Sequence, residues 1–146
     1  MLNATTATAT REKGWWIRLN TTDERYEFTS TVRADWTTDP SQYHAINLGD
    51  RPDDSPTNPT PVGTATYTVA SFHTHIPFIW DEGFRRVGPS PEDEDADEYQ
   101  DVPGLVYDYV GGSEFSDLGG EFLYPGHDLS AAARLYRSGP ERRSTP

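Results

Sequence analysis

Two histidines one residue apart are the side chains in this sequence best placed to bind a metal ion. His73 and His75 end the segment TATYTVASFHTH, whose threonine, valine and aromatic content predicts a central β-strand over residues 64–75. Residues two apart in a strand point to the same face, so the two imidazoles project side by side. Neutral imidazole is a good zinc ligand, and a catalytic zinc typically has three protein ligands and one open position. A third ligand is therefore needed.

A candidate third ligand lies downstream, in Ser90-Pro91-Glu92-Asp93. Serine at an N-cap, proline at the first helical position and an acid at the third form a helix-start signature. The signature places Asp93 at a helix N-terminus, from which its carboxylate can reach the metal. The Ser90 hydroxyl stays near the same point, where it can donate a hydrogen bond to a substrate oxygen. The 14 residues between His75 and Ser90 must fold back to bring Asp93 to the site.

Each of these patterns also has an explanation that needs no metal. A His-x-His in a strand can be two surface or cross-strand histidines, and Ser-x-x-Asp caps a helix with or without an ion. The other acids of the run that follows are most simply a solvated helix face. The aromatic group Phe78, Ile79 and Trp80 is interpreted as core filler, with a lid over the site as the alternative. The acids assigned to the solvated face are Glu94, Asp95, Asp97 and Glu98.

The remaining histidines, His44 and His127, have no partner at ligand spacing and are interpreted as surface or loop residues. The chain contains no cysteine. This excludes disulfides, thiolate metal sites and a cysteine nucleophile, so any metal must be held by histidine and carboxylate.

The charge of the chain limits its partners. Asp and Glu number 24 against 12 Lys and Arg, which gives a formal net charge of −12. Nucleic-acid-binding proteins present a basic face, so this balance argues against a phosphate-backbone partner and favours cations or basic partners. Proteins from high-salt environments are also strongly acidic, and this explanation of the charge is preferred to a functional acidic patch.

The length of 146 residues fits one domain with a core of its own. We expect an N-terminal arm over residues 1–11, the domain over 12–138 and a C-terminal tail over 139–146. No apolar run approaches the roughly 20 residues of a membrane span, and MLNATTATATREK lacks the apolar stretch of a signal peptide. A soluble protein is expected, either cytoplasmic or delivered as part of a larger secreted protein.

The remaining patterned segments predict strands, a loop and a turn. Alternating apolar residues predict a hairpin of strands over 15–20 and 25–32. The segment 35–63 contains five prolines and is expected to be a surface loop. Further short strands are expected over 105–110 and 121–124, with GGSEFSDLGG between them as turn material. The prediction is an α+β fold with a central mixed, mainly antiparallel sheet and short flanking helices.

The C-terminal part is expected to be helical. Asp128 can cap a helix in which Leu129, Ala132, Ala133 and Tyr136 share one face, and Gly139-Pro140 would end it. The last residues, ERRSTP, are expected to fray.

The order of a glutamate, His-x-His and Ser-x-x-Asp resembles the metalloprotease motif of the JAB/MPN (JAMM) family. Glu12, in REKGWWIRLN, matches the family's glutamate before a glycine and an apolar strand. The segment VPGLVYDY looks like the strand after the metal-site helix in a branch found at the C-termini of bacterial RHS-repeat and toxin-like proteins. The resemblance spans about Glu12 to Tyr109.

This resemblance implies a JAB/MPN-like fold with cytidine-deaminase-like α/β/α layering. It also implies a zinc-dependent hydrolase that cleaves amide bonds, either peptide or isopeptide, in a peptide or protein substrate. Zinc would be held by His73, His75 and Asp93. Glu12 would be the general base for the attacking water, and Ser90 would stabilise the oxyanion.

Two other functions stay open. One is a non-catalytic MPN-like binding module, against which the retained ligand set argues. The other is an effector or toxin module of a larger secreted bacterial protein.

Overall fold

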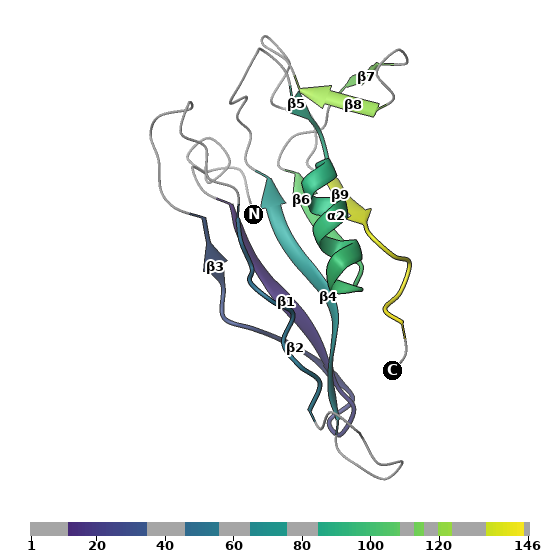
Figure 1. The fold of residues 1–146 in the computed structure, drawn as a ribbon. Helices are drawn as coiled ribbons and strands as arrows, with labels where there is room; N and C mark the ends of the chain where they lie inside the picture. The colour runs from purple at the N-terminus through teal and green to yellow at the C-terminus, as the bar shows by residue number, and fades with distance from the viewer. Residues whose placement is uncertain are drawn as a thin grey trace.

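The chain folds around a mixed sheet of six strands, with one helix and a separate three-stranded sheet in the described part (Figure 1). The computed structural model describes residues 12–34, 46–55, 65–75, 85–108, 113–115, 120–123 and 134–144. Within these ranges the main sheet has the order β2-β1-β4-β6-β9, with β3 also paired to β1. The predicted α+β class with a mixed, mainly antiparallel sheet is confirmed.

The elements of the main sheet are β1 (Lys13–Asn20), β2 (Arg25–Phe28), β3 (Val32–Arg33), β4 (Thr66–His75), β6 (Gly104–Asp108) and β9 (Arg134–Ser138). The helix is α2 (Pro91–Gln100). The second sheet contains β5 (Arg85–Arg86), β7 (Ser113–Phe115) and β8 (Gly120–Leu123). This smaller sheet lies beyond the C-terminal ends of β4 and β6 (Figure 1).

The predicted N-terminal hairpin is present as β1 and β2, which pair in register from Ile17 opposite Phe28 to Asn20 opposite Arg25. The Asn20 side chain accepts hydrogen bonds from the backbone N–H groups of Thr22 and Asp23, which stabilises the turn. The predicted returning strand is shorter than expected, because it ends at Phe28 and β3 then pairs with the start of β1.

Strand β4 is central, as predicted, with β1 antiparallel on one side and β6 parallel on the other. A parallel pair needs a crossover connection, and here α2 provides it. The C-terminal ends of β4 and β6 therefore meet at the same edge of the sheet. His75, the last residue of β4, lies opposite Asp108, the last residue of β6.

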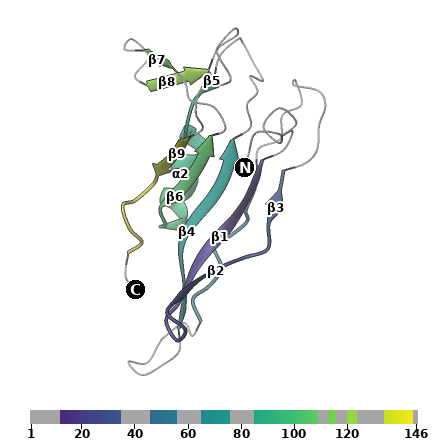
Figure 2. The same cartoon turned by 180° about the vertical axis from the view of Figure 1, so that it is seen from behind.

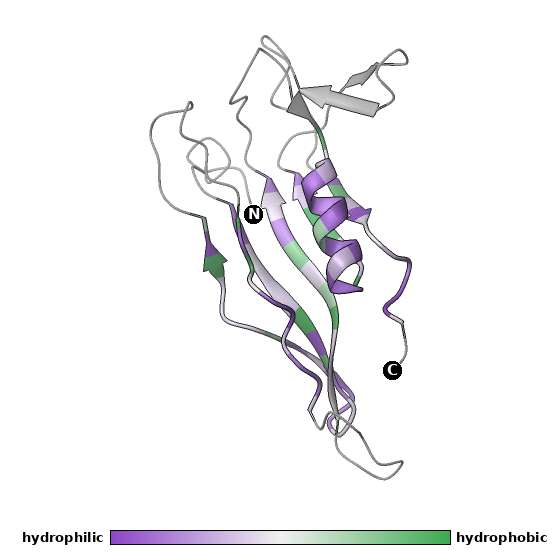
Figure 3. Ribbon diagram, viewed as in Figure 1, coloured by the Kyte–Doolittle hydropathy of each residue, from purple (hydrophilic) through white to green (hydrophobic). Residues whose placement is uncertain are grey.

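Helix α2 covers one face of the sheet without an apolar face of its own. Its sequence, PEDEDADEYQ, is mainly acidic and hydrophilic (Figure 3), and its one buried residue is Asp97. The Asp97 carboxylate accepts hydrogen bonds from the hydroxyls of Ser71 (2.8 Å) and Ser138. The prediction that Asp97 belongs to a solvated face is therefore wrong, whereas Glu94, Asp95 and Glu98 are exposed as expected.

Figure 2 shows the face of the main sheet opposite α2. Aromatic side chains pack on this face. The Trp15 and Phe72 rings stack with their centroids 4.5 Å apart, and Phe28 meets Trp15 edge-on at 6.4 Å. Among the described residues a helix covers only the α2 side, so they do not display the expected α/β/α layering.

Three expectations about the C-terminal half are wrong. Residues 134–138 form β9, not the end of a helix, and pair antiparallel with β6. Part of GGSEFSDLGG forms β7. The described part of the tail, residues 141–144, is anchored rather than frayed, because Arg143 makes a bidentate ion pair with Asp54 and also donates to the Thr68 carbonyl.

Several predictions concern residues outside the described ranges. They include the arm 1–11, the aromatic group Phe78–Trp80, the histidines His44 and His127, and the helix start at Asp128. Of the predicted loop 35–63, the described part 46–55 forms no regular strand or helix. In the described part of the chain, no helix is both long and apolar enough to span a membrane.

Candidate metal centre

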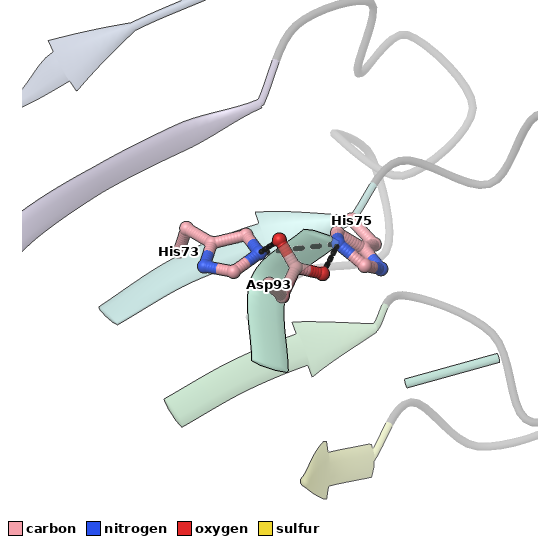
Figure 4. Close-up of side chains that lie close together, drawn as sticks. All are labelled: His73, His75 and Asp93. Atoms are coloured by element: carbon pink, nitrogen blue, oxygen red, sulfur yellow. Dashed lines mark hydrogen bonds and ion pairs between the residues drawn. The ribbon is translucent and has the colours of Figure 1, made fainter. Parts of the chain in front are cut away.

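The structure brings the two histidines and Asp93 together at the C-terminal end of β4 (Figure 4). His73 Nε2 lies 3.1 Å from His75 Nε2. Asp93 Oδ1 lies 3.2 Å from His73 Nε2, and Asp93 Oδ2 lies 3.2 Å from His75 Nε2. The three side chains are largely enclosed, with exposed fractions of 7%, 13% and 18% for His73, His75 and Asp93.

These distances fit three ligands around one ion. In a tetrahedral zinc site with ligands at about 2.0–2.1 Å, neighbouring ligand atoms are about 3.3–3.4 Å apart. The two imidazole nitrogens, 3.1 Å apart, come close to that spacing, and one ligand atom from each of the three residues lies within 4.8 Å of the others. The two Nε2 atoms are 3.1 Å apart and face the same carboxylate. If both carried a proton, the two N–H groups would repel each other. The cluster can hold a metal ion.

Asp93 is fixed by the capping box that the sequence predicts. The backbone N–H of Ser90 donates to Asp93 Oδ2 (2.7 Å), and the N–H of Asp93 donates to Ser90 Oγ (3.1 Å). The same carboxylate therefore caps α2 and faces both histidines, so its rotamer is set by the helix start. Ser90 is half-buried beside it, with its O–H still able to donate.

Glu12 also approaches this cluster. Gly14 pairs with His73, and continuing this antiparallel register by two residues places Glu12 beside His75. Glu12 is only 3% exposed, and its Oε2 accepts the backbone N–H of Ile46 (3.0 Å). Gly14 is required for this close approach, because a side chain there would collide with the Phe72 carbonyl and His73.

Asp108 is a site residue that the sequence reasoning missed. It is fully buried at the end of β6, and its Oδ2 lies 3.8 Å from His75 Nδ1. The same oxygen accepts the backbone N–H of Gly88 (3.1 Å). An acid inside the otherwise apolar and aromatic segment LVYDYV was the available signal. Its role depends on the parallel pairing of β6 with β4, which the sequence does not show.

Comparison of the sequence with known protein families, with curated proteins and with solved structures gives no match. The JAB/MPN resemblance therefore stays a prediction that rests on the motif residues.

The acids of the site change the protonation of His75. Burial alone would lower its pKa, but hydrogen bonds to Asp108 and Asp93 outweigh burial and raise the pKa of His75 to about 9. The charge of Glu12 contributes to the same rise. Burial would raise the pKa of Asp93, yet the hydrogen bonds with His73 and His75 hold it well below its usual range. Without a metal, the cluster is thus an ion pair at neutral pH.

This ion pair predicts a pH dependence of metal binding. A metal can bind His75 Nε2 only after that nitrogen loses its proton. With a pKa of about 9, zinc affinity should rise about tenfold per pH unit from pH 6.5 to 8 and level off above 9. Competition with a chelator at several pH values measures this dependence of zinc affinity on pH. Asp95→Asn is the control and should show the same slope as the parent. A flat profile over this range would contradict the site.

The stability of the metal-free protein should fall as the pH rises, whereas its affinity for zinc rises. A raised histidine pKa contributes stability that is fully present below the unfolded value of about 6.5 and is lost as the pH rises to about 9. Thermal unfolding of the metal-free protein should therefore occur at lower temperature at pH 9 than at pH 6.5, whereas added zinc should stabilise most at the higher pH.

Proposed function

We propose that this chain is a zinc-dependent hydrolase that cleaves amide bonds, peptide or isopeptide, with an activated water. The observation that carries the proposal is the convergence of His73, His75 and Asp93, whose ligand atoms all lie within 4.8 Å of one another. Two further groups of the kind that such chemistry needs, Glu12 and Ser90, border the same cluster.

The three clustered side chains would hold the metal through His73 Nε2, His75 Nε2 and one carboxylate oxygen of Asp93. When bound, zinc would polarise the substrate carbonyl and lower the pKa of a coordinated water towards about 7. Three protein ligands leave a tetrahedral position open, which is the arrangement of a catalytic rather than a structural zinc.

Glu12 is suited to move the proton. As water attacks the carbonyl carbon, the Glu12 carboxylate accepts its proton and then delivers that proton to the leaving nitrogen as the C–N bond breaks. The hydrogen bond that Oε2 accepts from the Ile46 N–H restricts the rotation of this carboxylate. The Ser90 hydroxyl donates a hydrogen bond to the carbonyl oxygen, where negative charge develops.

Metal analysis tests the site. We expect the purified chain to contain about one zinc per molecule, and His73→Ala, His75→Ala and Asp93→Ala to fall well below one, because each removes one of only three ligands. Inductively coupled plasma analysis after exhaustive dialysis gives the stoichiometry. Asp95→Ala is the matched control on the exposed side of α2 and should retain full zinc.

The same measurement tests which metal is present. Two histidines and one carboxylate also form the ligand set of non-haem Fe(II) oxygenases. Iron in place of zinc in protein purified without added metal would contradict the hydrolase and point to oxygen chemistry. Zinc, together with cleavage of peptides from a mixed library detected by mass spectrometry, would support the proposal.

A further inference from the structure

Asp108 contacts both parts of the chain that carry the metal ligands. Its Oδ2 accepts the N–H of Gly88, two residues before the helix cap Ser90, and lies 3.8 Å from His75 Nδ1. One buried carboxylate oxygen therefore links the strand that carries the histidines to the segment that leads to Asp93. The segment 87–89 is itself buried, so this link lies inside the protein.

The His75 ring lies between two carboxylates on opposite sides. Its Nε2 faces Asp93 Oδ2 at 3.2 Å and His73 Nε2 at 3.1 Å, and its Nδ1 faces Asp108. A neutral imidazole has one N–H and one lone pair, and a carboxylate near one nitrogen favours the proton on that nitrogen. The two carboxylates compete for the His75 proton. If a metal engages Nε2 and Asp93, Asp108 is the carboxylate left to face a proton, which then lies on Nδ1 and leaves the Nε2 lone pair for the metal.

Backbone features keep Asp108 in this position. Strand pairing places it directly opposite His75, and it is fully buried. Gly88 has a φ of +83°, and a side chain there would meet the Tyr136 ring, so only glycine presents its N–H to Asp108 without strain. The geometry is thus built into β4, β6 and the segment before α2.

We propose that Asp108 is a positioning residue of the metal centre, which fixes the tautomer and orientation of His75 for metal binding. This inference rests on the proposed metal site. Partners of this kind typically change metal affinity by about 10–100-fold when they are removed.

Zinc competition with a chelating dye tests the role. Asp108→Ala should bind zinc about 10–100-fold more weakly than the parent, and Asp108→Asn should recover part of that loss, because the amide oxygen can still accept a hydrogen bond. Asp54→Asn is the control: this acid pairs with Arg143, has a side chain only 9% exposed and makes no contact with either histidine. Its zinc affinity should stay within about threefold of the parent.

A second readout separates positioning from general destabilisation. In ¹⁵N-labelled zinc-loaded protein, the Nδ1–H of His75 should exchange slowly with solvent, and Asp108→Asn should speed its exchange while the His73 signals stay unchanged. The inference would be overturned if Asp108→Asn bound zinc as tightly as the parent and its His75 Nδ1–H exchanged at the parent rate. If Asp108→Ala does not fold, Asp108→Asn alone decides by the same two measurements. A parent that binds no zinc would overturn the metal site itself, which distinguishes the two failures.

Discussion

Replacing Glu12 by glutamine should lower the rate of amide hydrolysis about 10²–10⁴-fold and leave zinc content near one per chain. A general base acts on the water and not on the metal, so the change removes the proton acceptor while the three ligands remain. Glutamine has nearly the same size, and its amide oxygen can still accept the N–H of Ile46 that holds Glu12 Oε2. The buried position should therefore keep its shape.

Glu27→Gln is the matched control for this variant. Glu27 lies on β2, where it contacts Asn20 and Arg25 and none of the site residues. The rate of amide hydrolysis and the zinc content of Glu27→Gln should both match those of the parent. If Glu12→Gln instead retains near-parent activity, Glu12 is not the general base, and the proposed proton transfer is wrong. A pure binding module would lose neither zinc nor binding in Glu12→Gln, and its parent would show no turnover to lose.

The three members of the candidate metal cluster could be predicted because each depends on a local rule. His73 and His75 share a face through the two-residue period of a strand, and Asp93 follows from a capping signature over four consecutive residues. Long-range folding was needed only to bring the helix start to the strand end. The parallel β4-α2-β6 crossover achieves this, since a right-handed crossover returns the chain to the same sheet.

The C-terminal strand could not be predicted in this way. The spacing of Leu129, Ala132, Ala133 and Tyr136 fits one face of a helix, but Tyr136 instead lies in β9 opposite Val106. Five residues of β9 obtain their hydrogen bonds from the exposed edge of β6, and this pairing outweighs a weak local preference. Asp108 was missed for the same reason, because its importance depends on which strand lies beside it.

The polarity of α2 reveals how the site is held in place. A helix on a sheet normally buries an apolar stripe, whereas α2 faces the sheet with Asp93 and Asp97, which are four residues apart. Asp93 meets the two histidines, and Asp97 meets two serines from β4 and β9. Residues four apart share one face of a helix, so the same face supplies the carboxylate of the candidate metal cluster and the carboxylate that anchors α2.

Asp97→Ala should therefore lower the free energy of unfolding by about 3 kcal/mol, even in metal-free protein. The change removes two hydrogen bonds to a buried carboxylate and leaves the hydroxyls of Ser71 and Ser138 without this acceptor. The pocket is tight, because Gly104 and Gly139 leave no room for a β-carbon beside Asp97. A cavity at this position cannot easily be filled by its neighbours.

Urea unfolding at pH 7 measures the effect, and two variants sharpen it. Asp95→Ala makes the same chemical change on the exposed side of α2, so it controls for charge and helix propensity and should change stability by less than about 0.5 kcal/mol. Burial raises the pKa of Asp97 despite its two serine partners, so the fold favours the protonated carboxyl. This contribution to stability is fully present below the ordinary carboxyl pKa and is lost as the pH rises. Asp97→Asn, which cannot ionise and can accept one hydrogen bond while donating the other, should lie much closer to the parent than Asp97→Ala at pH 7. If Asp97→Ala and Asp95→Ala prove equally stable, α2 is held by something other than Asp97, and the anchoring role of this carboxylate is wrong.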